Sequence, residues 1–281
     1  MKNIHEAVNE IIVSLQNIYD FNEASNFAVL LFSHLRGYSR ADLHLNSNEK
    51  LSINENLFLT DALERLRHSE PIQYVIGECE FMGLIFNVNK NVLIPRPETE
   101  ELVEWVLDEI KENNLSVLDI GTGSGCIACA IKKYALYSIV EAYDISDMAL
   151  ATAKKNAERN NVKIKFKNVD ILNYHLKNEK FDIIVSNPPY ITEKEKKFIM
   201  PNVLDYEPHL ALFVPDNQPF LFYEKIMDFS LKALKPNGKL FFEINEQYGT
   251  ELVNLLESKG FKNIILKKDI AGRNRMVRGN V

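Results

Sequence analysis

Cysteines, histidine clusters and long apolar runs are scarce in this sequence, and each absence excludes a class of protein. Three cysteines are an odd number, which argues against a disulfide framework. Cys126 and Cys129 form a C-x-x-C pair, but no second pair completes a zinc site, so we interpret both as core residues. The six histidines are scattered without ligand spacing, and we therefore expect no metal site.

Membrane and export signals are also missing. No stretch approaches the ~18 uninterrupted apolar residues of a membrane span, and residues 1–6 contain no apolar signal core. We therefore expect a cytoplasmic protein without a membrane partner. At 281 residues the chain is long enough for one large domain and one small domain.

The chain is acidic, with a net charge of −6 from 33 basic and 39 acidic residues. Binding DNA requires compensating positive charge, which an acidic chain supplies only through a local basic patch. Lys163, Lys165 and Lys167 alternate along one segment, a pattern that is typical of solvated surface. We therefore expect no direct nucleic-acid partner, with a local basic patch as the alternative.

The first part of the chain, residues 1–72, has helical periodicity. Apolar residues recur at i, i+3, i+4 and i+7 spacing within residues 4–18 and again within residues 27–35. Residues 39–42 have the form of a capping box that begins a third helix, and residues 57–66 indicate a fourth. We predict a small helical bundle that recognises a protein partner, because it contains no catalytic constellation.

The rest of the chain changes its periodicity. Residues 73–95 predict a linker, in which residues 73–88 form two short strands around Met82 and Gly83. Within residues 96–281, apolar strands alternate with amphipathic helices, and residues 261–278 predict a terminal hairpin. Such alternation predicts an α/β domain whose mainly parallel sheet is covered by helices on both faces.

A glycine-rich turn follows the first predicted strand of this domain. Residues 116–125 predict a buried strand that runs into the turn and then into a helix near Cys126. Glycines allow the backbone to approach a ligand closely, and a helix start supplies free N–H groups. Cys126 occupies the position where a dinucleotide fingerprint needs its third glycine, and no Lys-Ser or Lys-Thr pair follows as in a P-loop. We therefore predict a nucleotide-type ligand that lacks a pyrophosphate.

Two acidic residues follow the next predicted strands. Asp144 stands about 20 residues after the glycines, where a carboxylate holds a ribose diol. Asp170 follows the third strand, where it is positioned to accept a hydrogen bond from an adenine amino group. As alternatives, Asp144 caps the helix that begins near Ser146, and Asp170 is a turn residue.

Residues 187–190, Asn-Pro-Pro-Tyr, directly follow the apolar strand predicted for residues 181–186. Two prolines fix two φ angles and remove two backbone donors, so the carbonyl of Pro188 points outward without a helical partner. With the amide oxygen of Asn187 and the ring of Tyr190, it suits a planar NH2 group, which offers two donors and a face for stacking. A plain proline-rich turn is the alternative.

Together these features resemble the class I S-adenosylmethionine-dependent methyltransferases, and more narrowly the peptide chain release factor glutamine N5-methyltransferases. The resemblance extends along nearly the whole chain, to residues 71–74, 77–81, 92–102, 206–212, 242–247 and 269–275. Pro-Arg-Pro-Glu-Thr-Glu at residues 95–100 is its specific part, because many methyltransferases share the glycine turn and the 187–190 loop.

The resemblance implies a Rossmann-like catalytic domain over residues 96–281, with a seven-stranded sheet whose last strand is antiparallel. It further implies an N-terminal helical domain over residues 1–72 that helps to grip the substrate, and a β-hairpin linker over residues 73–95. The implied reaction transfers a methyl group from S-adenosylmethionine, which becomes S-adenosylhomocysteine. The implied acceptor is the N5 nitrogen of the glutamine in the Gly-Gly-Gln motif of release factors, and its methylation would modulate translation termination. We also expect the enzyme to be a monomer.

Site residues follow from the same resemblance. Asn187 and Pro188 would accept the two amide hydrogens of the substrate, and Tyr190 would clamp the amide plane; these three are the predicted catalytic residues. The predicted substrate-binding residues are Asn187, Pro188, Pro189, Tyr190, Arg96 and Glu98. The predicted cofactor-binding residues are Asp119, Gly121, Thr122, Gly123, Ser124, Gly125, Asp144, Asp170, Ile171 and Asn187.

Several alternatives stay open. A ribosomal protein glutamine methyltransferase would share every active-site residue, a DNA adenine-N6 methyltransferase would share the 187–190 loop, and a non-catalytic binding module is a third possibility. Arg96 and Glu98 either contact the substrate or cofactor or form an ion pair at the helix start. Arg273 and Arg275 are open in the same way, with a position on the surface near the C-terminal hairpin as the alternative to a functional role.

Overall fold

Two compact units make up the chain. The computed structural model describes residues 2–111, 114–174 and 180–281. The helical unit comprises Met1–Gly77 and Met200–Tyr206, and the α/β unit comprises Glu78–Ile199 and Glu207–Val281. The boundary between residues 77 and 78 lies inside the linker predicted for residues 73–95, and the three-part division stays a prediction.

The helical unit contains the helices predicted for the first part of the chain. These are α1 (Ile4–Leu15), α2 (Phe21–Arg36), α3 (Arg40–Leu45) and α4 (Ile53–Arg67). Each begins at a residue whose side chain accepts a backbone N–H of the first turn, a contact worth about 1 kcal/mol; these residues are Asn3, Asp20, Ser39 and Ser52. Among the described helices of the chain, none combines the length and the apolar character needed to cross a membrane.

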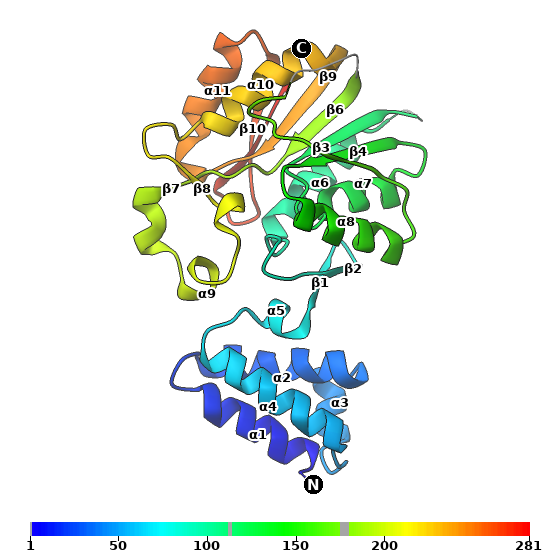
Figure 1. The fold of residues 1–281 in the computed structure, drawn as a ribbon, viewed down its shortest axis with the longest axis vertical. Helices are drawn as coiled ribbons and strands as arrows, with labels where there is room; N and C mark the ends of the chain where they lie inside the picture. Colours follow the sequence, from blue (N-terminus) through cyan, green and yellow to red (C-terminus); the bar gives the residue numbers. More distant parts are fainter. Residues whose placement is uncertain (1, 112–113, 175–179) are drawn as a thin grey trace. The chain divides into compact units, whose positions relative to one another are not determined.

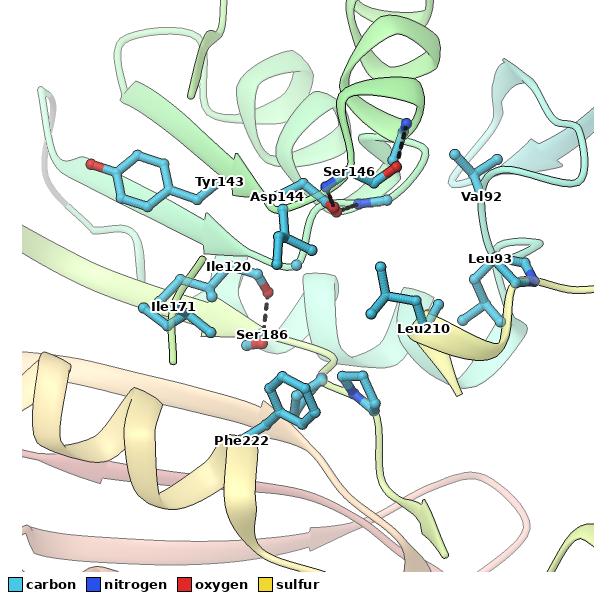
Figure 2. A pocket seen from close by; sticks show the side chains of 18 of the residues that line it. Val92, Leu93, Ile120, Tyr143, Asp144, Ser146, Ile171, Ser186, Leu210 and Phe222 are labelled. Carbon is cyan, nitrogen blue, oxygen red and sulfur yellow. Dashed lines mark hydrogen bonds between the residues drawn. The ribbon is translucent and has the colours of Figure 1, made fainter. Parts of the chain in front are cut away.

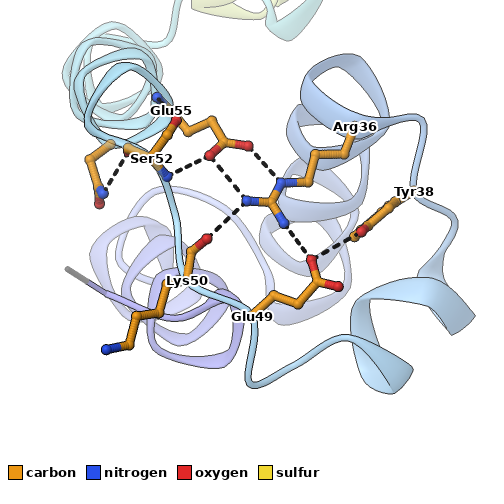
Figure 3. Close-up of polar contacts among 7 residues, drawn as sticks. Arg36, Tyr38, Glu49, Lys50, Ser52 and Glu55 are labelled. Atoms are coloured by element: carbon orange, nitrogen blue, oxygen red, sulfur yellow. Dashed lines mark hydrogen bonds and ion pairs between the residues drawn. The ribbon is translucent and has the colours of Figure 1, made fainter.

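Charged side chains of the helical unit cluster around Arg36, the last residue of α2 (Figure 3). Its Nε donates to Glu55 Oε1 at 2.6 Å, and its Nη1 donates to Glu49 Oε2 at 2.6 Å. Its Nη2 donates to the Lys50 carbonyl at 3.1 Å. One guanidinium therefore ties the end of α2 to the start of α4 and to the loop before it.

The predicted linker begins with a helix rather than with a strand. Residues predicted as the start of a strand at Gln73 form α5 (Ile72–Ile76), which ends at Gly77 with a φ of +85°. The prediction was wrong because a segment of five residues, mostly apolar with one polar residue, is too short for its pattern to distinguish a helical turn from a short strand.

The predicted hairpin follows directly and belongs to the α/β unit. It consists of β1 (Glu78–Phe81) and β2 (Leu84–Asn87), which are antiparallel around a turn at residues 82–83. The Asn156 side chain accepts the backbone N–H of Asn87 at 2.7 Å and donates to its carbonyl at 3.0 Å. This pair of bonds fixes the hairpin to α8 (Asp147–Arg159), and the chain then continues into residues that line the cavity described below.

A seven-stranded sheet forms the centre of the α/β unit, in the order β10-β11-β9-β6-β3-β4-β5 (Figure 1). The strands are β3 (Ser116–Ile120), β4 (Ile139–Asp144), β5 (Lys165–Asn168), β6 (Phe181–Ser186), β9 (Leu234–Glu243), β10 (Lys262–Lys268) and β11 (Asn274–Asn280). β11 is antiparallel to both of its neighbours, whereas the other pairs are parallel. The predicted mainly parallel sheet with a terminal hairpin is confirmed.

Helices cover both faces of this sheet (Figure 1). The core on one face is formed with α6 (Pro97–Glu109), α7 (Cys126–Tyr134) and α8 (Asp147–Arg159), and the core on the other with α10 (Leu221–Ala233) and α11 (Gly249–Ser258). Successive residues of β3 enter different cores, since Val117 packs in the first and Leu118 in the second. Both faces are apolar, as the near-continuous apolar strands predict.

Short elements between β6 and α10 have no counterpart in the sequence prediction. They are β7 (Ile191–Thr192), η1 (Glu193–Phe198), α9 (Pro201–Leu204), η2 (His209–Ala211) and β8 (Phe213–Val214), and η3 (Glu246–Tyr248) follows β9. β7 and β8 pair in parallel, so the chain returns to the point where it left the sheet. Elements of two to six residues are too short for a periodic pattern to reveal.

Candidate active site

A cavity of ≈ 310 Å³ opens at the carboxyl ends of β3, β4 and β6 (Figure 2). Ile120 ends β3, Asp144 ends β4, and Asn187 directly follows β6; all three line the cavity. In open sheets of parallel strands, ligands bind in the crevice at this edge. The cavity is therefore the candidate active site.

The glycine turn presents its backbone to the cavity. Gly121 and Gly123 line it with φ angles of +74° and +54°, and no described heavy atom lies within 4 Å of a Cβ built on either residue. Gly125 has a different role, because its Cβ would lie 3.0 Å from the Cβ of Ala153 on α8. Two glycines therefore leave room for a ligand, and the third lets α7 approach α8 closely.

The N–H groups of the turn itself hold it against β4, whereas the expectation of free N–H groups concerned the start of the helix near Cys126. Gly121 and Thr122 donate to the Tyr143 carbonyl at 2.9 and 3.0 Å, and Gly123 donates to Asp144 Oδ2 at 2.8 Å. These amides are thus not available to an anion. This arrangement agrees with the prediction of a ligand that lacks a pyrophosphate.

Asp119, just before the turn, is fully buried and only partly satisfied. Its Oδ2 accepts the Thr122 hydroxyl at 2.6 Å, whereas its Oδ1 has no hydrogen-bond partner among the described residues. Burial raises the pKa of this carboxyl to about 7, and the nearby charge of Asp144 adds to the rise, while the Thr122 hydrogen bond opposes it. An orphaned carboxylate oxygen at this depth is suited to a cationic partner.

Asp144 lines the cavity with both carboxylate oxygens engaged once. Oδ2 accepts the Gly123 N–H at 2.8 Å, and Oδ1 accepts the Ser146 N–H at 2.9 Å. Burial raises the pKa of the carboxyl, and these backbone hydrogen bonds counteract the rise. Because an ionised carboxylate accepts about four hydrogen bonds, it keeps capacity for two ligand hydroxyls.

Asp170 and Ile171 also line the cavity, after β5. Asp170 Oδ1 accepts the Leu172 N–H at 3.0 Å and Oδ2 accepts Asn173 Nδ2 at 2.7 Å. These local bonds are those of a turn residue, the alternative given above, and Asp170 nevertheless faces the cavity. Ile171 contributes an apolar wall beside it (Figure 2).

The loop at residues 187–190 runs along one wall of the cavity. Asn187, Pro188 and Pro189 line it, and Asn187 Nδ2 donates to the Thr99 hydroxyl at 3.3 Å. Just before the loop, the Ser186 hydroxyl donates to the Ile120 carbonyl at 2.7 Å and so fixes the ends of β6 and β3. The loop therefore starts from a rigid base.

Tyr190 packs into the core on the α10 side of the sheet rather than among the residues that line the cavity. Its hydroxyl donates to Glu243 Oε1 at 3.2 Å. Burial raises its pKa, and the neighbouring Glu243 charge raises it further. The phenol thus stays neutral and acts as a hydrogen-bond donor.

Arg96 and Glu98 have different surroundings. The Arg96 guanidinium forms an ion pair with the buried carboxylate of Glu207, which also accepts the Ile94 N–H at 3.2 Å. The pair connects the segment before α6 to the segment before η2, and both segments line the cavity. Glu98 is half-buried in the first turn of α6, near enough for its charge to raise the pKa of Glu243.

The two C-terminal arginines differ in exposure. The Arg273 side chain is 63% exposed, as the surface alternative predicts, whereas that of Arg275 is 12% exposed, so the surface interpretation was wrong for Arg275. Arg275 Nε donates to Asp269 Oδ2 at 3.1 Å. Its charge lowers the pKa of Glu243, which places it beside the buried carboxylate.

Sequence reasoning did not single out several residues that shape the cavity. Leu93, Leu210 and Phe222 come from three different segments and form apolar walls (Figure 2). Leu93 and Leu210 lie in the motif strings 92–102 and 206–212, which were the available signal. Phe222 on α10 had none, because an apolar residue on an amphipathic helix is expected in the core.

Comparison with known proteins gives the chain a family. The methyltransferase small domain model matches residues 99–206, and the PrmC N-terminal domain model matches residues 6–77. A release factor glutamine methyltransferase from Flavobacterium psychrophilum is 49% identical over 278 residues, which cover 96% of both chains. One from Bacteroides thetaiotaomicron is 41% identical over 268 residues, 95% of this chain and 96% of that protein.

Solved structures agree on the fold. A methyltransferase from Pyrococcus furiosus superposes with a TM-score of 0.51 over 71% of this chain and 90% of that chain, at 20% identity. The α/β unit therefore has the class I methyltransferase fold, as the resemblance predicted. On the strength of the identity over almost its whole length, the chain belongs to the family of release factor glutamine methyltransferases.

Proposed function

We propose that this enzyme transfers a methyl group from S-adenosylmethionine to the glutamine side-chain nitrogen in the Gly-Gly-Gln motif of peptide chain release factors. The observation that carries the proposal is the position of Asn187 and Pro188, which line the cavity beside the glycine turn and have an amide oxygen and a carbonyl as acceptors. Relatives named for release factor glutamine methylation, 49% and 41% identical, support this substrate class.

The residues of the cavity fit S-adenosylmethionine. Gly121 and Gly123 allow close approach, and Asp144 has spare acceptor capacity for the ribose hydroxyls. Asp119 is not among the residues that line the cavity, and its buried Oδ1, just before the glycine turn, is the acceptor that we assign to the ammonium group of the methionine part. Bound there, the cofactor would supply a methyl group on a sulfonium, which is already a strong electrophile.

The enzyme's task is then to orient a poor nucleophile. The lone pair of an amide nitrogen is delocalised into its carbonyl, so geometry must compensate for low reactivity. Asn187 Oδ1 and the Pro188 carbonyl would accept the two N–H groups of the glutamine amide, which turns the nitrogen toward the cavity. Both oxygens also stabilise the positive charge that the nitrogen gains during transfer.

Proton loss needs no dedicated base in this scheme. The nitrogen becomes strongly acidic once it is methylated and sheds its proton through the same acceptors or to water. Meanwhile the apolar walls of Leu93, Leu210 and Phe222 exclude competing water from the cavity.

The remaining roles follow from the substrate class. We assign recognition of the release factor in part to the helical unit, which the PrmC N-terminal domain model matches. Since release factors act in translation, we infer a cytoplasmic site of action, and we retain the prediction of a monomer.

A methyl-transfer assay tests the proposal directly. Labelled S-adenosylmethionine is incubated with the enzyme and with one of four acceptors: a bacterial release factor, the same factor with its Gly-Gly-Gln glutamine changed to alanine, a ribosomal protein extract, and duplex DNA. We expect label only on the intact release factor. The Asn187→Ala enzyme is the matched control for the catalytic loop.

Each other outcome overturns the proposal in a defined way. Label confined to the ribosomal extract would assign the chain to ribosomal protein glutamine methylation. Label confined to DNA would limit the interpretation to the chemistry of the 187–190 loop. Label on the alanine-substituted factor would show that the methylated atom lies elsewhere.

A further inference from the structure

One buried carboxylate, Glu243, is linked by hydrogen bonds to both polar side chains of the 187–190 loop, directly to Tyr190 and through Thr99 to Asn187. Glu243 ends β9 and is 2% exposed. Its Oε1 accepts the Tyr190 hydroxyl at 3.2 Å, and its Oε2 accepts the Thr99 hydroxyl at 2.6 Å. Thr99 Oγ1 in turn accepts a hydrogen bond from Asn187 Nδ2 at 3.3 Å. Glu243 therefore contacts Tyr190 directly and Asn187 through Thr99.

This chain of hydrogen bonds has a defined polarity. An ionised carboxylate only accepts, so the single hydrogen of the Thr99 hydroxyl is directed to Glu243. The hydroxyl then presents only lone pairs to Asn187, which must turn its NH2 group toward Thr99. If the amide were flipped, its Oδ1 would face those lone pairs, which is repulsive. The ionised carboxylate thus determines which way Asn187 points its acceptor oxygen.

We propose that Glu243 is a positioning residue for methyl transfer, which acts through Thr99 to keep Asn187 Oδ1 directed at the substrate amide and which also holds Tyr190. The inference rests on the proposed function, because it assigns Asn187 Oδ1 the role of orienting an amide nitrogen. Glu243 itself contacts neither substrate nor cofactor in this scheme.

The surroundings of Glu243 make its ionisation conditional. Burial raises its pKa and the Glu98 charge raises it further, whereas the Thr99 and Tyr190 hydrogen bonds and the Arg275 charge lower it. Once protonated, Glu243 has a hydrogen to donate, and the Thr99 hydroxyl is released to donate to Asn187 instead. The facing groups are Glu98 on α6, Tyr190 in the loop, Tyr223 on α10, whose hydroxyl donates to the Glu243 carbonyl, and Arg275 on β11.

Substitutions that nearly preserve side-chain size distinguish an effect of hydrogen-bond direction from an effect of packing. The glutamine of Glu243→Gln can donate to Thr99, and Thr99→Val removes the hydroxyl. Each substitution should lower kcat about 10-fold or more. The KM for the release factor and the Kd of S-adenosylhomocysteine should stay within about twofold of the wild-type values. Thr99→Ser keeps the hydroxyl and should have a kcat close to that of the wild-type enzyme. Ser230→Ala, which removes a buried hydroxyl with no hydrogen-bond partner among the described residues, is the matched control and should change nothing.

The double variant tests whether the two residues act together. Because Glu243 reaches Asn187 through Thr99, Glu243→Gln combined with Thr99→Val should be no slower than the worse single variant. The proposal would be overturned if the fold-decreases in kcat of the two single variants multiplied in the double variant, or if Glu243→Gln left kcat unchanged. If Glu243→Gln does not fold, the contrast between Thr99→Val and Thr99→Ser decides the question, and equal kcat in both would overturn it.

A spectroscopic readout keeps this proposal separate from the proposed function. The side-chain ¹⁵N amide resonance of Asn187 should shift as Glu243 titrates in the wild-type enzyme and should lose this titration in Glu243→Gln. An Asn187 resonance that titrates identically in both proteins would refute the connection. Should the wild-type enzyme fail to label a release factor, the proposed function falls, while this measurement still decides whether Glu243 controls Asn187.

Discussion

Asn187 contributes to the reaction through one atom, so its removal is expected to affect turnover more than binding. Asn187→Ala keeps the glycine turn and the acidic residues that fit the cofactor but removes an oriented acceptor. We expect kcat to fall because transition-state stabilisation is lost. This loss should be on the order of 2 to 4 kcal/mol, as for the removal of other oriented polar partners. Single-turnover kinetics with the release factor measure this loss. Near-normal turnover combined with weaker cofactor binding would instead make Asn187 a cofactor-binding residue.

Asp119 is a fully buried carboxyl whose ionisation opposes folding, because burial raises its pKa. Its pKa of about 7 in the folded protein lies above the ordinary carboxyl value of 3.8, so the folded state binds its proton more tightly than the unfolded state. The resulting stability is fully present below the unfolded pKa and is lost as pH rises through about 7. At pH 8, Asp119→Asn should therefore raise the free energy of unfolding by on the order of 2 kcal/mol.

The same substitution should weaken the binding of the cofactor. The difference in unfolding free energy between Asp119→Asn and wild type should shrink toward zero near pH 4, which urea titrations at both pH values would show. The neutral side chain should also raise the Kd of S-adenosylmethionine, because the ammonium group loses its carboxylate partner. A variant that is both no more stable at pH 8 and equally good at binding the cofactor would contradict this role for Asp119.

At the scale of elements, the sequence predicts what is local and periodic. The strand at Ser116–Ile120, the glycine turn and the helix from Cys126 follow one another along the chain, and the structure has each of them. The contact between Thr99 and Glu243 joins residues that are 144 positions apart, so no spacing rule reveals it. The same holds for the ion pair of Arg96 with Glu207, since partners far apart in the sequence are brought together by topology rather than by local pattern.

The junction of α2 and α4 should be acid-sensitive. The hydrogen bond from Arg36 lowers the pKa of Glu55 to about 2. A depressed pKa contributes stability above the unfolded value, and this contribution is lost as pH falls from about 4.5 toward 2. Wild type should exceed Glu55→Gln in stability by about 1 kcal/mol at pH 6, a figure reduced for solvent screening, and the two should converge near pH 2.

A second glutamate of α4 provides the control. Glu64 is 63% exposed and lies 3.7 Å from Arg67, so Glu64→Gln should leave stability unchanged at both pH values. Hydrogen exchange of the α2 and α4 amides reports the helical unit separately from the α/β unit. Equal effects of the two substitutions would show that the Arg36 cluster stabilises no more than an ordinary surface pair.

For the whole molecule, the division into two units makes a prediction about how cofactor binding is distributed. Every residue that lines the cavity belongs to the α/β unit. A ligand that binds only the folded state stabilises it by about 2.7 kcal/mol when its concentration is 100 times its Kd. S-adenosylhomocysteine at that concentration should therefore slow hydrogen exchange in β3, β4, β6 and α10 but leave α1 to α4 unchanged. Equal protection of the helical unit would show that the two units unfold as one cooperative body, and that the helical unit senses the occupied cavity before any release factor binds.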